Sequence, residues 1–228
     1  MTERSELEAR KLARIAAVHR LQRERTALLV VDMQKAFVEP GAALEVETAG
    51  RLVPNLKTLI SVCRGLDVPV VFTQYVFSES VPCLRGDPFG PQHLPPVAGE
   101  ATGYGRPSGN ALMGTSGPNS PDIIDALHPR EDELIVKGRA YDKFYGTELD
   151  QALRSRDIRY LIVTGVLADV CVNATILSAS TREYRVTAVT DGTATLWPHI
   201  LEACFHIWRR KFARLATTAE VVEELRTV

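Results

Sequence analysis

Apolar and polar positions along the chain form two patterns that follow one another and predict strands and helices in turn. Six short runs are rich in valine, isoleucine and leucine, and four of them are almost continuously apolar, which is typical of strands buried on both faces of a sheet. The runs lie at residues 26–33, 68–75, 133–138, 160–165, 185–190 and, more weakly, 213–217.

Segments with helical character separate these runs, at residues 51–65, 147–157, 170–183 and 198–211. Strands and helices that alternate at this spacing indicate crossover connections, and therefore a parallel sheet with helices on both faces. The chain of 228 residues is long enough to form one such domain around a well-buried core. We therefore predict an α/β fold of three layers, α/β/α, over residues 26–228.

Two regions depart from this alternation. Residues 1–25 carry apolar residues at roughly helical spacing, which predicts an amphipathic arm that packs on its own subunit or on a neighbour. Residues 78–121 are rich in proline and glycine and follow the carboxyl end of the second predicted strand. Ligands bind at that edge of open α/β sheets, so this long loop is expected to cover a substrate or contact another subunit, unless it is an insertion without a role.

Composition excludes several classes of protein. The 27 basic and 28 acidic residues nearly balance, which gives no support for a nucleic acid or an anionic membrane as the partner. No apolar run approaches the length of a membrane span, and the first residues lack the apolar core of a signal peptide. The four cysteines are widely spaced, without a C-x-x-C pair, as expected of a cytoplasmic protein and not of a disulfide framework.

Three residues whose side chains could take part in catalysis lie at the ends of predicted strands. Asp32 closes the first strand, Lys137 closes the third, and Cys171 lies just beyond the fourth, where a helix begins. Taken singly, each has an ordinary explanation, as a turn residue, a solvated lysine or a small buried side chain. In a parallel sheet, however, the carboxyl ends of all strands share one edge, so we expect these residues to meet in one crevice.

Such a group has the parts needed for acyl transfer. A helix N-terminus and the ammonium of Lys137 would favour the thiolate of Cys171, and Asp32 would accept the thiol proton and return it to a leaving amine. An ordinary aspartate is a weak base for a thiol. Either desolvation raises the pKa of Asp32, or the proton moves only as substrate binds.

Three stretches of the chain resemble the isochorismatase-like family of cysteine hydrolases: LLVVDMQKAF, IVKGRAYDKFYGTELDQALRSRDIRYLIVTGV and GVLADVCVNATILSA. The resemblance implies a Rossmann-like sheet of six parallel strands and a triad of Asp32, Lys137 and Cys171. It also implies a cis peptide bond between Val166 and Leu167, with the N–H groups of Leu167 and Cys171 forming an oxyanion hole. Members of the family are commonly homodimers or homotetramers, which is the expectation here.

Departures from the family pattern narrow the activity. The second predicted strand continues as VVFTQYVFSES, without the histidines of the metal site in the nicotinamidase branch, so we expect no metal and no other cofactor. Cys171 argues against the vinyl-ether-cleaving isochorismatases, which generally lack this cysteine. The stretch KGRAYDKFYGT is one residue longer than in common relatives, which leaves the positions of Arg139, Tyr141 and Lys143 open.

The remaining branch comprises hydrolases of small amides and carbamoyl compounds, such as ureidoacrylate, biuret, N-carbamoylsarcosine and maleamate. We therefore expect an amidohydrolase whose partner is a small amide or ureido substrate. The alternatives are a vinyl-ether hydrolase of the same fold and a binding module without activity. The residues expected to line the substrate are Gln34, Phe37, Tyr141, Val166 and His199, although Phe37 fits the core equally well and His199 fits a helix surface.

Overall fold

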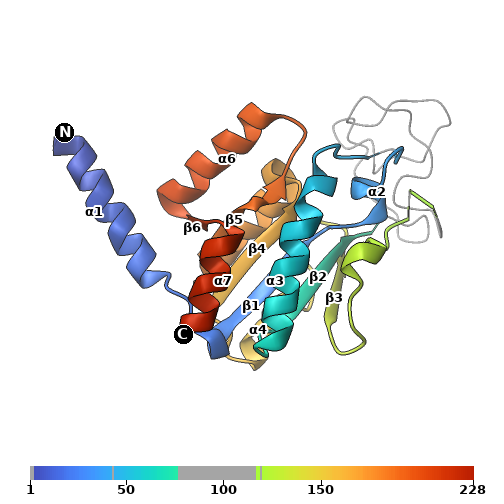
Figure 1. The fold of residues 1–228 in the computed structure, drawn as a ribbon, viewed down its shortest axis with the longest axis horizontal. Coiled ribbons are helices and arrows are strands. Elements are labelled where there is room, and N and C mark those ends of the chain that lie inside the picture. The colour runs from blue at the N-terminus through green and yellow to red at the C-terminus, as the bar shows by residue number, and fades with distance from the viewer. Residues whose placement is uncertain (1–2, 43, 77–116, 119) are drawn as a thin grey trace.

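The computed structural model describes residues 3–42, 44–76, 117–118 and 120–228. Its centre is one sheet of six parallel strands in the order β3-β2-β1-β4-β5-β6 (Figure 1). The strands are β1 (Thr26–Val31), β2 (Val70–Tyr75), β3 (Leu134–Gly138), β4 (Tyr160–Val166), β5 (Arg185–Ala194) and β6 (Ala213–Ala216). The predicted sheet of six parallel strands is confirmed, including its weakest member, β6.

Helices cover both faces of the sheet and complete the three layers. Buried side chains of α3 and α7 pack on one face, and those of α4, α5 and α6 pack on the other. The helices are α1 (Glu3–Val18), α2 (Lys35–Val38), α3 (Val53–Gly65), α4 (Leu149–Ser155), α5 (Asn173–Thr181), α6 (Pro198–Lys211) and α7 (Thr218–Thr227). The sequence patterns did not predict α7, which begins with a capping box between Thr217 and Glu220.

The order of the strands determines where a ligand site forms. The chain runs outward from β1 through β2 to β3, then returns to add β4, β5 and β6 on the other side. The order in which strands are added to the sheet therefore reverses between β1 and β4. At the carboxyl ends of these two strands, the segments that follow them turn to opposite sides and leave room for a ligand. Asp32 follows β1 directly, and Cys171 lies in the turn after β4.

Gly165 allows β4 to lie close beside β1. Its φ is +105°, and a Cβ atom at this position would stand 1.9 Å from the carbonyl oxygen of Val31, its partner in the register of the two strands. No other residue type fits there without displacing the backbone of β1.

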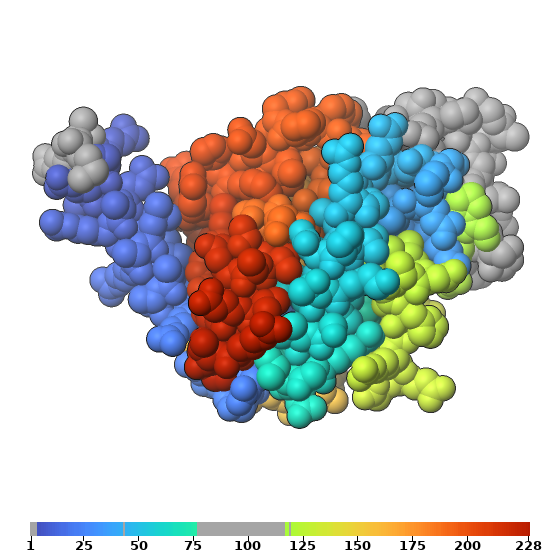
Figure 2. Space-filling model, viewed as in Figure 1, coloured from blue at the N-terminus to red at the C-terminus, as the bar shows by residue number. Residues whose placement is uncertain are grey.

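The arm α1 stands apart from the rest of the fold (Figures 1 and 2). Two hydrogen bonds tie it to the body: in the middle of the helix Lys11 Nζ donates to the Arg210 carbonyl at 2.7 Å, and just beyond its end the Leu21 N–H donates to Glu224 Oε1 at 2.6 Å. Leu7 and Val18 are exposed on it. Among the described residues, no helix is long and apolar enough to cross a membrane. The expectation that residues 78–121 cover the site falls mostly on residues 77–116, outside the described part.

Candidate active site

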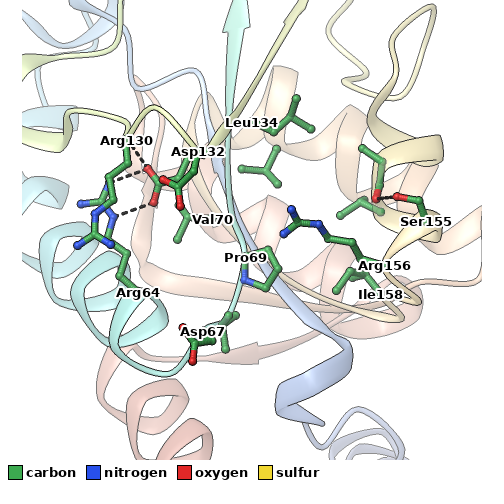
Figure 3. Close-up of a pocket in the computed structure, with 15 residues that line it drawn as sticks. Arg64, Asp67, Pro69, Val70, Arg130, Asp132, Leu134, Ser155, Arg156 and Ile158 are labelled. Atoms are coloured by element: carbon green, nitrogen blue, oxygen red, sulfur yellow. Dashed lines mark hydrogen bonds and ion pairs between the residues drawn. The ribbon is translucent and has the colours of Figure 1, made fainter.

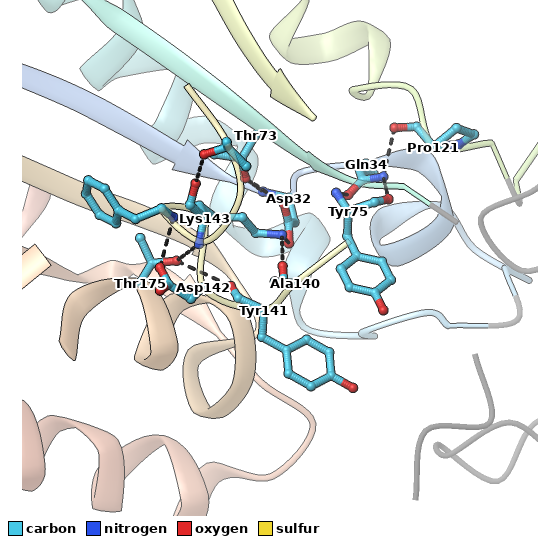
Figure 4. Close-up of polar contacts among 12 residues, drawn as sticks. Asp32, Gln34, Thr73, Tyr75, Pro121, Ala140, Tyr141, Asp142, Lys143 and Thr175 are labelled. Atoms are coloured by element: carbon cyan, nitrogen blue, oxygen red, sulfur yellow. Dashed lines mark hydrogen bonds and ion pairs between the residues drawn. The ribbon is translucent and has the colours of Figure 1, made fainter. Parts of the chain in front are cut away.

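Asp32 is completely buried at the carboxyl end of β1. Its φ of 49° lies in the left-handed region, which residues other than glycine seldom adopt. Thr73 of β2 holds it in place: the Asp32 N–H donates to Thr73 Oγ1 at 3.1 Å, and the Thr73 hydroxyl donates to Asp32 Oδ1 at 2.6 Å (Figure 4). The other carboxylate oxygen, Oδ2, is left to face a cation.

That cation is Lys143, which lies in the segment between β3 and α4. Its Nζ is 2.7 Å from Asp32 Oδ2, and both side chains are completely buried (Figure 4). Nζ also donates to the Ala140 carbonyl at 3.3 Å and lies 5.1 Å from the centre of the Tyr75 ring. Burial alone would lower the pKa of Lys143, but its neighbours, chiefly the Asp32 carboxylate, outweigh burial and raise the pKa above its ordinary value.

Lys137, the lysine expected in this position, is elsewhere. It lies on the edge strand β3 opposite Gln74, its side chain is exposed, and it makes no ion pair or hydrogen bond with any described residue. Side chains alternate along a strand, so the buried Val136 leaves Lys137 on the other face. Lys137 therefore does not lie in the crevice where we expected it, and the extended stretch KGRAYDKFYGT instead brings Lys143 to Asp32.

Cys171 completes the group. It lies in η5 (Ala168–Val172), a π-helical turn that leads into α5, and only 2% of it is exposed. Lys143, Asp32 and the Leu167 backbone N–H all lie near enough to the sulfur to influence its pKa. Burial raises the pKa of Cys171 well above its ordinary value; Lys143 opposes this shift and the negative charge of Asp32 adds to it. The resting group therefore consists of a thiol beside an ion pair.

The backbone before Cys171 has the geometry that the family resemblance implies. The peptide bond between Val166 and Leu167 is cis. The Leu167 carbonyl accepts the N–H groups of Val170 and Val172, at 3.1 and 3.0 Å. The Leu167 N–H lies near enough to Cys171 to act towards a lower pKa of the thiol.

The other two described thiols differ from Cys171. Burial raises the pKa of Cys63 to about 12. Burial, followed by the charge of Asp169, raises the pKa of Cys204 to about 11. Neither shift involves a lysine, and neither residue lies at the carboxyl edge between β1 and β4. Cys171 is therefore the only described thiol whose pKa is influenced by both a buried carboxylate and an ammonium.

Gln34 is part of the framework of the site and not of its lining, contrary to expectation. Its side-chain amide donates to the carbonyls of Tyr75 and Pro121 at 2.9 and 2.8 Å, and its carbonyl accepts the Tyr75 N–H at 2.7 Å (Figure 4). The residue is completely buried. Gln34 thus joins the end of β2 to the segment near Pro121, and the bonds to the backbone occupy its polar atoms.

The remaining expected lining residues lie in different environments. Tyr141 is half-buried beside the site, and its ring stacks on that of Tyr75 with the centres 5.8 Å apart. Phe37 and Val166 are buried in the core cluster between the sheet and α3, so packing accounts for both. His199 is exposed on the first turn of α6, which fits the surface interpretation.

Sequence reasoning missed Lys143 and Thr73. Thr73 had a signal, because it is a polar residue inside the apolar run VVFTQY. Lys143 had a weaker signal. The extra residue in KGRAYDKFYGT showed only that this stretch is spaced differently from that of common relatives. Within the described part of the chain, no group of three or more histidine, cysteine, aspartate and glutamate residues could hold a metal ion.

A large pocket lies at the opposite end of the strands. It has a volume of about 500 Å³ and lies where β2 and β3 begin, beside Arg64, Pro69, Glu133 and Arg156 (Figure 3). None of its lining residues is a cysteine or a histidine. The reactive group of Asp32, Lys143 and Cys171 is at the other edge of the sheet.

Comparisons with known proteins agree with this fold. The isochorismatase domain model matches residues 26–220. A ureidoacrylate amidohydrolase (RutB) of Caulobacter vibrioides is 28% identical over 202 residues, which cover 86% of this chain and 88% of the relative. The structure of a cysteine hydrolase from Pseudomonas syringae pv. phaseolicola is similar, with a TM-score of 0.78 and 27% identity over 91% of this chain and 95% of the other.

An N-carbamoylsarcosine amidase from Thermoplasma acidophilum is similar as well, with a TM-score of 0.65 and 26% identity over 85% of this chain and 96% of the other. The family that the three sequence stretches resemble is thus confirmed. By its domain match, its sheet and its relatives, the chain belongs to the isochorismatase family.

Proposed function

We propose that this protein hydrolyses the C–N bond of a small linear amide or carbamoyl compound, using Cys171 as the nucleophile. One observation carries the proposal: the Asp32 carboxylate is 2.7 Å from the Lys143 ammonium, and both groups lie near enough to Cys171 to influence the pKa of its thiol. A candidate nucleophile, a candidate base and a cation thus lie together in a buried site. The similarity to relatives named as a ureidoacrylate amidohydrolase and a carbamoylsarcosine amidase supports the class of substrate.

The first half of the reaction forms a thioester. Cys171 is a thiol at rest, so its proton passes to Asp32 as the sulfur attacks the carbonyl carbon of the bound amide. The N–H groups of Leu167 and Cys171 stabilise the negative oxygen of the tetrahedral intermediate. The C–N bond then breaks, the proton on Asp32 moves to the departing nitrogen, and an amine or ammonia leaves.

The second half returns the enzyme to its starting state. Asp32 takes a proton from a water molecule, whose oxygen attacks the thioester carbon. The C–S bond breaks, the acid product leaves, and the proton on Asp32 returns to sulfur. Throughout, Lys143 stays within reach of both Asp32 and Cys171, so its positive charge offsets whichever of them is negative.

Substitution of the nucleophile tests this mechanism. Ammonia release is measured for a panel of small ureido acids and primary amides with the unmodified protein, with Cys171→Ala and with Cys204→Ala as a matched control in a buried cysteine of α6. We expect Cys171→Ala to abolish hydrolysis and Cys204→Ala to retain it. Acid quenching during turnover, followed by mass spectrometry, should reveal an acyl group on the peptide that contains Cys171.

Two results would overturn the proposal. Full hydrolysis by Cys171→Ala, or by protein alkylated at Cys171, would indicate chemistry without covalent attack, as in a vinyl-ether hydrolase. A folded protein that hydrolyses no member of the panel would favour a binding module.

A further inference from the structure

The segment that carries Lys143 is not part of a helix or a strand. β3 ends at Gly138 and α4 begins at Leu149, so ladder hydrogen bonds do not fix the residues between them. Lysine has a long side chain with many rotamers, and holding its Nζ 2.7 Å from Asp32 requires a fixed backbone. The structure contains a specific set of side-chain bonds that meets this requirement.

Thr175 of α5 makes two of those bonds. Its Oγ1 accepts the backbone N–H of Lys143 at 3.2 Å, and its hydroxyl donates to the Tyr141 carbonyl at 3.4 Å (Figure 4). On the other side of the lysine, the Thr147 hydroxyl donates to the Lys143 carbonyl. Thr175 is completely buried, so water cannot replace its hydroxyl.

Asp142 provides a second connection to the same helix. Its Oδ1 accepts the Phe144 N–H at 2.9 Å, which closes a turn around Lys143. Its Oδ2 accepts the Ser178 hydroxyl at 2.8 Å. Thr175 and Ser178 are one turn apart on α5, so they hold the Lys143 segment at two points along one helix face.

The same helix also follows the nucleophile. Cys171 lies four positions before Thr175, in the turn that continues directly into α5. Any displacement of this helix therefore carries the sulfur and the anchor of Lys143 together. This arrangement keeps the distance between the thiol and the ammonium constant.

We propose that Thr175 is a positioning residue for the amide hydrolysis proposed above, because it fixes the Lys143 backbone to the helix that directly follows the turn with Cys171. The inference rests on that proposed function for its reaction, but its effect on the thiol can be measured without a substrate. Thr175 acts through Lys143 and does not itself contact the reacting atoms.

Three substitutions test the inference. Thr175→Val keeps the shape and removes the hydroxyl, whereas Thr175→Ser keeps the hydroxyl. Thr181→Val is the matched control, because Thr181 is exposed on the same helix and, among the described residues, its hydroxyl bonds only to carbonyls of that helix, at 3.2 and 2.8 Å. The rate at which iodoacetamide alkylates Cys171 is followed against pH by peptide mass spectrometry, and circular dichroism checks the fold.

We expect Thr175→Val to slow alkylation at neutral pH by about fivefold to tenfold, the effect of losing one buried hydrogen bond that supports a charge. The midpoint of its pH profile should move to higher pH, since Lys143 favours the thiolate. Thr175→Ser should stay within about twofold of the unmodified protein, and Thr181→Val should be unchanged. In turnover, kcat should fall while KM stays the same.

An unchanged alkylation profile in folded Thr175→Val would overturn the inference, as would a failure of Thr175→Ser to restore it. If Thr175→Val does not fold, Ser178→Ala replaces it and should produce a smaller shift in the same direction; no shift would again overturn the inference. A shifted profile in a protein that hydrolyses no amide would refute the proposed function alone. Normal hydrolysis with an unshifted profile would refute the positioning role alone.

Discussion

The two ends of the sheet each hold a close ion pair, in contrasting surroundings. At the amino end, Arg64 donates two hydrogen bonds of 2.7 Å to Glu133, on the wall of a pocket of about 500 Å³. At the carboxyl end, Asp32 and Lys143 are 2.7 Å apart with no exposure at all, and both lie near enough to Cys171 to influence the pKa of its thiol. The pocket at the amino end is large enough for a small ligand, but Asp32, Lys143 and Cys171 lie at the carboxyl end.

The contrast shows how differently the two pairs relate to stability. Complete burial of two charges costs several kcal/mol in lost hydration, and their attraction repays it only with good geometry. An apolar pair of the same size would serve the core at least as well as Asp32 and Lys143 do. The buried pair is therefore explained by its proximity to Cys171, whereas Arg64 and Glu133 join α3 to the start of β3.

The largest expected effect comes from removing the buried cation. Lys143→Met leaves Asp32 buried without a partner, so we expect the free energy of unfolding to fall by about 3–5 kcal/mol. Hydrolysis should fall by a factor on the order of 1,000, because the charge that offsets the thiolate and the carboxylate is lost. Urea unfolding and steady-state kinetics measure the two effects.

Lys137→Met is the control for that change, since it removes an exposed lysine from β3, the strand that precedes the segment with Lys143. Its stability should change by less than about 0.5 kcal/mol, and its activity should be retained. Loss of activity in Lys137→Met, with activity preserved in Lys143→Met, would restore Lys137 as the catalytic lysine.

The second-largest effect separates two proposed roles of the Asp32 carboxylate, as the base in hydrolysis and as a charge that raises the pKa of Cys171. Asp32→Asn removes the base, so hydrolysis should fall by a factor of about 100 to 10,000. It also removes the negative charge that helps to raise the pKa of Cys171, so iodoacetamide should alkylate the thiol faster near neutral pH than in the unmodified protein. Slower alkylation would mean that Asp32 does not act on the thiol as its position indicates.

The smallest effect belongs to the amino end. Burial alone would raise the pKa of Glu133, but its hydrogen bonds from Arg64 and the Arg130 backbone bring the pKa below its ordinary value. The stabilisation by this carboxylate is therefore complete above its unfolded pKa and is lost as the pH falls through the folded pKa. Glu133→Gln should cost about 1 kcal/mol at pH 7 and almost nothing in strong acid, with hydrolysis unaffected.

Urea unfolding of both proteins between pH 7 and pH 3 measures this convergence. A difference in stability that persists unchanged at low pH would show that the charge of Glu133 is not its source. A loss of hydrolysis would show that the two ends of the sheet are coupled.

The sequence predicted the sheet well and one member of the reactive group badly, for a physical reason. Strands such as β1 and β4 are buried on both faces, so their apolar runs mark them and the residues that follow them, Asp32 and Cys171. Lys143 lies in a segment without the apolar periodicity of a helix or a strand. Its position depends on hydrogen bonds made by Thr175, which is distant in the sequence, and by the neighbouring Asp142. We expected functional residues at the carboxyl ends of strands, and this expectation led to Lys137, the lysine at the end of β3.

Gln34 illustrates the same limit in the opposite direction. Its place two residues after Asp32 suggested a role in contacting substrate, but its amide completes the hydrogen bonding of the Tyr75 and Pro121 backbones. A polar residue that follows a candidate catalytic residue in the sequence can belong to the support of the site as readily as to its lining. Sequence does not separate these roles, because both require a buried amide at the same position.

The approach of β4 to β1 at Gly165 has a consequence for the chemistry farther along each strand. Asp32 is the next residue after Val31, and the turn with Cys171 begins just beyond Val166. A methyl group at position 165 would clash with the Val31 carbonyl and force the two strands, and with them Asp32 and Cys171, apart. The absence of one carbon atom between two neighbouring strands thus sets the spacing across which the proposed proton transfer would take place.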